Sequence, residues 1–104
     1  MKVFVVDDSP LVRERLVSLL SEVEGVDVVG SADSADEGIK GISSSKPDVA
    51  VLDIRMPAGN GIAILERIKR QGNSPTIIML TNYPYPQYRK KCMDADTVLH
   101  VKLL

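Results

Sequence analysis

Short apolar runs alternate along the whole chain with segments of helical spacing. The runs cover residues 3–6, 26–29, 49–52, 76–80 and 98–101. They are rich in β-branched residues, and most show no strict alternation of polar and apolar positions. Such runs are typical of strands that are buried on both faces, as in a parallel sheet covered by helices. The pattern therefore predicts five strands.

The segments between the runs predict four helices. Their apolar stripes consist of Val12, Leu16, Leu19, Leu20 and Val23 in the first, Ile39 and Ile42 in the second, and Ile64, Leu65 and Ile68 in the third. Ser9 and Ser34 stand where the N-caps of the first two helices are expected. Gly38 and Gly41 lower the helix propensity of the second. A fourth helix is predicted from about Pro86 to Met93.

Strictly alternating strands and helices with right-handed crossovers define a doubly wound α/β fold. We expect a parallel five-stranded sheet in the flavodoxin-like order 2-1-3-4-5. The last run is followed by three residues only, so the fifth helix of such a fold is expected to be missing. Residues 1–104 are expected to form one domain.

The composition restricts the class of protein and the compartment in which it is expected. Of 104 residues, 44% are hydrophobic and 26% are charged, as in an ordinary globular domain. The net charge of −1 gives no overall basic field for nucleic acid or an anionic membrane. A single cysteine excludes a disulfide framework. The early carboxylates of MKVFVVDD argue against a signal peptide, and no apolar run reaches the roughly 18 residues of a membrane helix. We expect a cytoplasmic protein.

Candidate chemistry lies directly after the apolar runs, because ligands of doubly wound sheets bind beyond the carboxyl ends of the strands. Asp7 and Asp8 follow the first run and Asp53 follows the third. Thr81 follows the fourth and Lys102 the fifth. If the first and third strands are neighbours, three carboxylates converge at the sheet edge.

Three carboxylates at close range repel one another unless a cation joins them. Carboxylate oxygens at an open edge suit a hard ion, and Mg²⁺ is the natural candidate. A carboxylate is also a nucleophile toward phosphorus. A metal ion, a lysine ammonium and a hydroxyl are what the oxygens of a phosphoryl group need around them. These residues therefore predict phosphoryl acceptance on a carboxylate.

Three segments resemble the receiver domain of bacterial two-component response regulators. They are Asp7-Asp8, the stretch DIRMPAGNG from Asp53 to Gly61, and IIMLT from Ile77 to Thr81, and the similarity covers about residues 1 to 93. The resemblance implies that a partner histidine kinase or a phosphotransfer protein phosphorylates Asp53. It further implies a conformational switch driven by that phosphorylation.

The resemblance also implies roles for the other residues. Asp7, Asp8 and Asp53 would hold Mg²⁺ together with the backbone carbonyl of Arg55. Thr81 would bond the phosphoryl group, and Lys102 would contact its oxygens. The spacing from Thr81 to Lys102 is one residue shorter than is usual in the family.

Two other functions remain open. One is a degenerate receiver that binds partners without being phosphorylated, in line with the shifted lysine. The other is a phosphatase with an aspartate nucleophile, although the haloacid-dehalogenase type separates its two acids by one residue. As a receiver the chain would be an interaction module without an output domain, not an enzyme. The missing fifth helix would bare an apolar sheet face, so we also expect self-association through that face.

Overall fold

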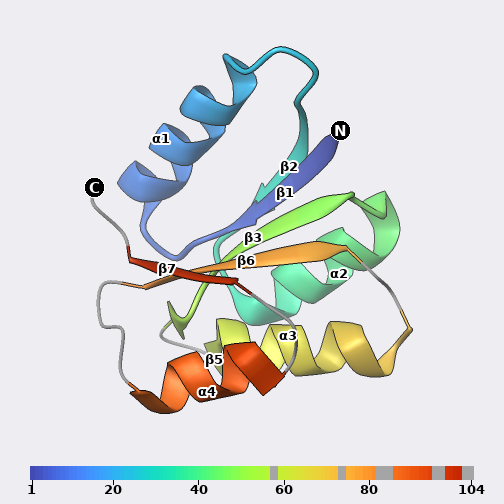
Figure 1. The fold of residues 1–104 in the computed structure, drawn as a ribbon. Helices are drawn as coiled ribbons and strands as arrows, with labels where there is room; N and C mark the ends of the chain where they lie inside the picture. The colour runs from blue at the N-terminus through green and yellow to red at the C-terminus, as the bar shows by residue number, and fades with distance from the viewer. Residues whose placement is uncertain (57–58, 73–74, 82–85, 95–97, 102–104) are drawn as a thin grey trace.

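The computed structural model describes residues 1–56, 59–72, 75–81, 86–94 and 98–101 (Figure 1). Its elements are β1 (Lys2–Val6), α1 (Pro10–Ser21), β2 (Asp27–Ala32), α2 (Ala35–Ser45), β3 (Val49–Asp53), β4 (Arg55–Met56), β5 (Gly59–Asn60), α3 (Gly61–Arg70), β6 (Thr76–Thr81), α4 (Pro86–Asp94) and β7 (Val98–Val101).

The main sheet is parallel, with the strand order β2-β1-β3-β6-β7. This is the predicted order 2-1-3-4-5 once the two-residue strands β4 and β5 are set aside, so the predicted fold class is confirmed. β4 and β5 pair with each other as a separate antiparallel ladder. The sequence did not predict this ladder because two-residue strands are too short to show a period.

Helices cover the two faces of the sheet unequally. On one face, α2 and α3 pack on β1 and β3 around buried residues such as Ile42, Leu52 and Ile64, and α4 lies beside α3 (Figure 1). On the other face, the described residues include one helix, α1. It packs on Val3, Val5 and Val51 through partly buried residues, namely Leu16, Val17 and Leu20.

Close packing explains why α2 forms despite its two glycines. A Cβ at Gly41 would lie 2.6 Å from Cε2 of Phe4, and one at Gly38 would lie 2.9 Å from Cγ2 of Val6. Contacts below 3.0 Å force a shift, so the glycines allow α2 to approach β1. Ser34 caps the helix as predicted, because its Oγ accepts from the Glu37 N–H at 3.3 Å.

Two sequence-based boundaries are wrong. The second strand spans Asp27–Ala32 and not 26–29, and its residues are mostly half-buried or exposed, because it is the edge strand. The first helix ends at Ser21, and short-range hydrogen bonds from Glu22 to Leu19 and from Val23 to Leu20 then tighten the chain. Val23 and Leu19 are 52% and 50% exposed, so these two positions of the predicted stripe do not enter the core.

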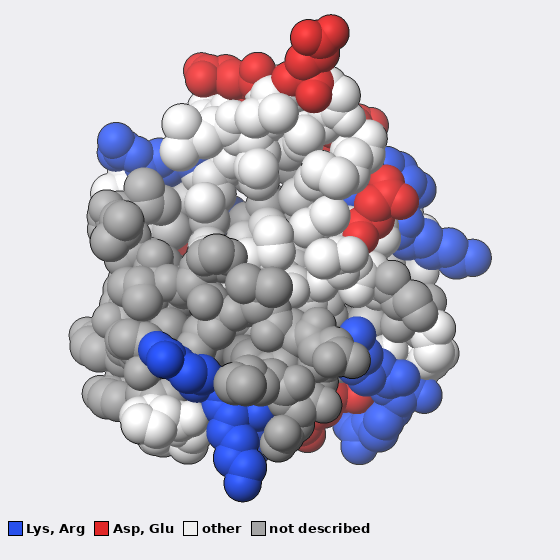
Figure 2. All heavy atoms as spheres, in the orientation of Figure 1, with Lys and Arg blue, Asp and Glu red and all other residues white. Residues whose placement is uncertain are grey.

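Charge is distributed unevenly over the surface. Figure 2 shows several Lys and Arg side chains along the edge formed by α3 and α4, others on the two flanks, and a group of acidic side chains at the opposite end beside the α1–β2 turn. The exposed basic residues of these two helices are Arg67, Lys69, Arg70, Arg89, Lys90 and Lys91. Among the described residues, no helix is long and apolar enough to cross a membrane.

Candidate functional site

The first two acids lie in the tight connection between β1 and α1. Asp7 continues β1 and donates its backbone N–H to the carbonyl of Ala32 at 3.1 Å, which ties it to the end of β2. Its carboxylate Oδ1 accepts from the N–H of Ser9 at 3.0 Å. Ser9 in turn caps α1, since its Oγ accepts from the Val12 N–H at 3.3 Å. The start of α1 and the carboxylate of Asp7 are therefore positioned by one network.

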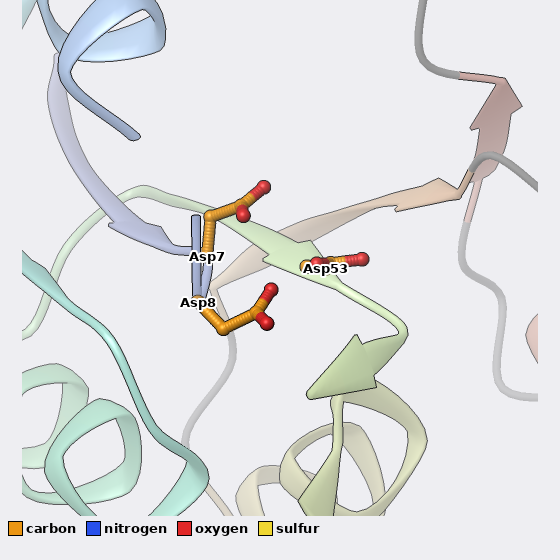
Figure 3. Close-up of side chains that lie close together, drawn as sticks. All are labelled: Asp7, Asp8 and Asp53. Atoms are coloured by element: carbon orange, nitrogen blue, oxygen red, sulfur yellow. The ribbon is translucent and has the colours of Figure 1, made fainter. Parts of the chain in front are cut away.

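The third acid comes from the neighbouring strand. Val6 pairs with Leu52 in the parallel register of β1 and β3, so the residues that follow them, Asp7 and Asp53, leave the sheet at the same level. Oxygen atoms of Asp7, Asp8 and Asp53 all lie within 4.8 Å of one another. Figure 3 shows the three carboxylates gathered at this end of the strands. The predicted convergence is present.

Burial differs among the three carboxylates. Asp7 is 1% exposed and Asp53 is 5% exposed, whereas Asp8 is half-buried. Carboxylates this close repel one another, and that repulsion grows where water is excluded. Oxygen donors of this charge and spacing, open to solvent on the side of Asp8, fit a hard divalent cation such as Mg²⁺.

The other predicted site residues are Thr81, Arg55 and Lys102, and the structure describes the backbone of the first two. Asp53 pairs with Leu80 in the register of β3 and β6, so the backbone of Thr81 stands one residue beyond that pair, at the same end of the sheet. Arg55 lies two residues after Asp53, and its backbone pairs with that of Asn60 in the ladder of β4 and β5. Lys102 lies outside the described residues.

Two supporting contacts were not predicted from the sequence. The Nη1 of Arg13 donates to the backbone carbonyl of Asp7 at 2.8 Å. At the first residue of α3, the backbone of Gly61 comes so close to β3 that a Cβ there would lie 3.0 Å from the carbonyl carbon of Asp53 and closer still to its oxygen. Both contacts involve backbone atoms of the acidic residues.

The parallel sheet with acids at the ends of β1 and β3 defines a doubly wound α/β domain with a candidate metal and phosphoryl site. Consistent with this, the family model for the response regulator receiver domain matches residues 3–102. The chain therefore belongs to the receiver domain family of two-component response regulators, whose members work in signalling based on phosphorylation.

Individual relatives agree with this assignment. The chain is 33% identical over 101 residues, or 97% of its length, to the sensory transduction protein LytT of Bacillus cereus, of which it spans 40%. Among solved structures, the signal receiver domain of the response regulator NarL from Mycobacterium tuberculosis superposes with a TM-score of 0.92 at 29% identity, covering 99% of this chain and 84% of that one. CheY in the CheX-CheY-BeF3-Mg complex from Borrelia burgdorferi gives a TM-score of 0.91 at 26% identity, covering 100% and 79%.

Proposed function

We propose that this domain accepts a phosphoryl group on Asp53 in a Mg²⁺-dependent reaction and signals through the resulting change in charge. The observation that carries the proposal is the meeting of Asp53 with Asp7 and Asp8, whose oxygens lie within 4.8 Å of one another at the carboxyl edge of the sheet. The chain belongs to the receiver domain family, whose members generally bind Mg²⁺ at an acidic pocket, and the cluster of Asp7, Asp8 and Asp53 supports such a site here.

Asp7 and Asp8 would hold the metal together with Asp53 and the backbone carbonyl of Arg55. When bound, Mg²⁺ supplies positive charge to the carboxylates and to the oxygens of the phosphoryl group. The rigid placement of Asp7, through Ala32 on one side and Ser9 on the other, keeps its carboxylate beside Asp53 before any ligand arrives. Such preorganisation favours transfer because no reorganisation is needed during the reaction.

In the transfer itself, a carboxylate oxygen of Asp53 attacks the phosphorus of a phosphohistidine. The P–O bond to Asp53 forms while the P–N bond breaks, and the histidine, which carries a proton on its other ring nitrogen, leaves as the neutral imidazole. The donor would be a sensor histidine kinase or a phosphotransfer protein. We propose that Thr81, whose backbone stands one residue beyond the Asp53–Leu80 pair, and Lys102 then interact with the bound group.

The phosphorylated state would differ from the free state mainly in charge. A phosphoryl group carries a charge of about −1.5 to −2 near neutral pH, and it would replace here the single negative charge of a carboxylate that is 5% exposed. A charge at that depth acts on the groups around it more strongly than a charge at the surface. We propose that this biases the end of β6 and the helix α4 between two arrangements.

The test is labelling by a small phosphodonor, acetyl phosphate or phosphoramidate, followed by intact mass with and without Mg²⁺. We expect one phosphoryl group per chain, dependent on Mg²⁺ and lost in Asp53→Asn, which keeps the shape of the side chain without its nucleophilic charge. Asp36→Asn, at an exposed position of α2, is the matched control and should label normally.

The remaining outcomes separate the alternatives. Steady release of phosphate from small phosphoesters would indicate a phosphatase. A chain that neither labels nor releases phosphate would be a degenerate receiver that works by binding alone. Labelling that persists in Asp53→Asn would show that Asp53 is not the acceptor.

A further inference from the structure

Arg13 reaches from α1 back to the acidic residues at its start. It lies in the first turns of the helix, where its own N–H donates to the carbonyl of Ser9 at 2.9 Å. Its side chain is half-buried and lines an open pocket of about 500 Å³ between α1 and β2. From there its Nη1 donates to the backbone carbonyl of Asp7 at 2.8 Å. A long, flexible cation is thus fixed on one backbone atom beside the site.

The carbonyl that Arg13 holds belongs to the peptide unit between Asp7 and Asp8. The N–H of Asp7 is fixed by Ala32 at 3.1 Å, and its Oδ1 is fixed by Ser9 at 3.0 Å. Arg13 supplies a third fixed point at the carbonyl. Because the peptide unit is planar, fixing its carbonyl fixes where the N and Cα atoms of Asp8 stand, and this position together with the φ of Asp8 sets the direction of its Cα–Cβ bond. Asp8 is the most exposed of the three acids and depends on that direction to face Asp53.

We infer that Arg13 is a positioning residue for the metal site: its hydrogen bond to the Asp7 carbonyl keeps the Asp8 carboxylate directed toward Asp53. This inference rests on the proposed function, because the positioned carboxylate is useful only if the three acids hold a cation. Hydrogen bonds that orient metal ligands typically contribute 10- to 100-fold to metal affinity.

The positive charge of Arg13 lowers the affinity for Mg²⁺, whereas its positioning hydrogen bond raises it, so the two contributions can be told apart. A guanidinium near a metal site repels a divalent cation, so loss of the charge alone strengthens Mg²⁺ binding. Loss of the positioning hydrogen bond weakens it. The sign of the change in the dissociation constant therefore tells which contribution dominates.

The experiment measures Mg²⁺ affinity by calorimetric titration in four proteins: the parent, Arg13→Met, Arg13→Lys and Arg15→Met. Arg15 is exposed on the same helix, so Arg15→Met removes the same charge without the contact to Asp7. Arg13→Met should raise the Mg²⁺ dissociation constant about 10-fold. Arg13→Lys keeps the charge and one donor and should recover most of the affinity, while Arg15→Met should leave it unchanged or slightly tighter.

A second readout separates positioning from a general loss of structure. At saturating Mg²⁺, the labelling rate of Arg13→Met should return to within about 2-fold of the parent, because the chemistry at Asp53 is intact once the metal is bound. Titrations are made well below the unfolding midpoint of each variant. Unchanged or tighter Mg²⁺ binding in Arg13→Met, or equal weakening in Arg15→Met, would overturn the inference. A parent protein that neither binds Mg²⁺ nor labels would instead overturn the proposed function.

Discussion

Gly61 sits where α3 begins against the end of β3, and replacing it with alanine is the sharpest steric test of how the site is held. A Cβ at this position would lie 3.0 Å from the carbonyl carbon of Asp53, closer to its oxygen, and 3.2 Å from Cα of Ile54. The N–H of Gly61 also donates to the carbonyl of Ile54 at 2.8 Å. All three neighbours are backbone atoms, so no side-chain rotation relieves the overlap.

The expected magnitudes follow from that geometry. Gly61 has no positive φ, so alanine is not excluded by its backbone conformation and in open space would stabilise the helix by up to about 1 kcal/mol. Overpacking a rigid neighbour costs about 1–3 kcal/mol, so Gly61→Ala should lose about 1–2 kcal/mol net. In a domain of this size each kcal/mol lowers Tm by about 4–8 °C. Displacing a reacting group by about 1 Å can slow a reaction 100-fold, so labelling of Asp53 should slow at least 10-fold.

The assay combines thermal unfolding by circular dichroism with the time course of labelling by acetyl phosphate at saturating Mg²⁺. Gly41→Ala is the matched control, because its Cβ would overlap the ring of Phe4 in the core and not a residue of the acidic site. It should lose stability while labelling at close to the parent rate. If Gly61→Ala labels within 2-fold of the parent and melts no lower, the start of α3 does not position Asp53.

Three further predictions test the site, the core and the face covered by α1. Asp8→Ala removes a half-buried carboxylate of the acidic cluster and should weaken Mg²⁺ binding at least about 10-fold; an unchanged titration would contradict its role as a ligand. Gly41→Ala should destabilise the parent by about 1–2 kcal/mol but much less in a Phe4→Leu background, and equal effects in both, measured by denaturant unfolding, would show that the ring does not limit the approach of α2. The apolar side chains of Leu19, in α1, and of Val23, two residues beyond its end, are exposed, so we expect concentration-dependent self-association that the change of both to serine reduces. Light scattering coupled to size exclusion measures it, and a parent that stays monomeric at high micromolar concentration would refute it.

The strand order and the acidic cluster were predictable because each depends on the residue types of short segments, namely apolar strands and the polar residues that follow them. Buried strands such as Val3–Val6 are uniformly apolar, and polar residues at their carboxyl ends must meet at one edge of a parallel sheet. The predicted edge strand was misplaced because β2 is half-exposed and its apolar run is therefore not diagnostic. Val23 was assigned to the core because its spacing continues the helical stripe, although the helix ends at Ser21.

The glycines of α2 also show that local sequence patterns do not reveal tertiary contacts. Local propensity counts Gly38 and Gly41 against a helix, whereas in the folded protein they are the positions at which α2 approaches Val6 and Phe4. Tertiary packing decides the outcome, and a single sequence gives no indication of which residue will lie opposite a glycine.

The contacts that place the acidic groups could not be read from the sequence, because they are made with backbone atoms. Arg13 binds the carbonyl of Asp7, and Gly61 leaves room for the carbonyl of Asp53. Every residue has a carbonyl, so neither contact requires a recognisable partner side chain. A chain that kept Asp7, Asp8 and Asp53 but lost Arg13 or Gly61 would present the same strand-end acids and the same predicted chemistry. Its carboxylates would nevertheless be directed differently, and a divalent cation discriminates strongly between donor geometries. The carboxylates that supply the chemistry of the site can therefore be predicted from the strand ends. The residues that direct these carboxylates, Arg13 and Gly61, cannot.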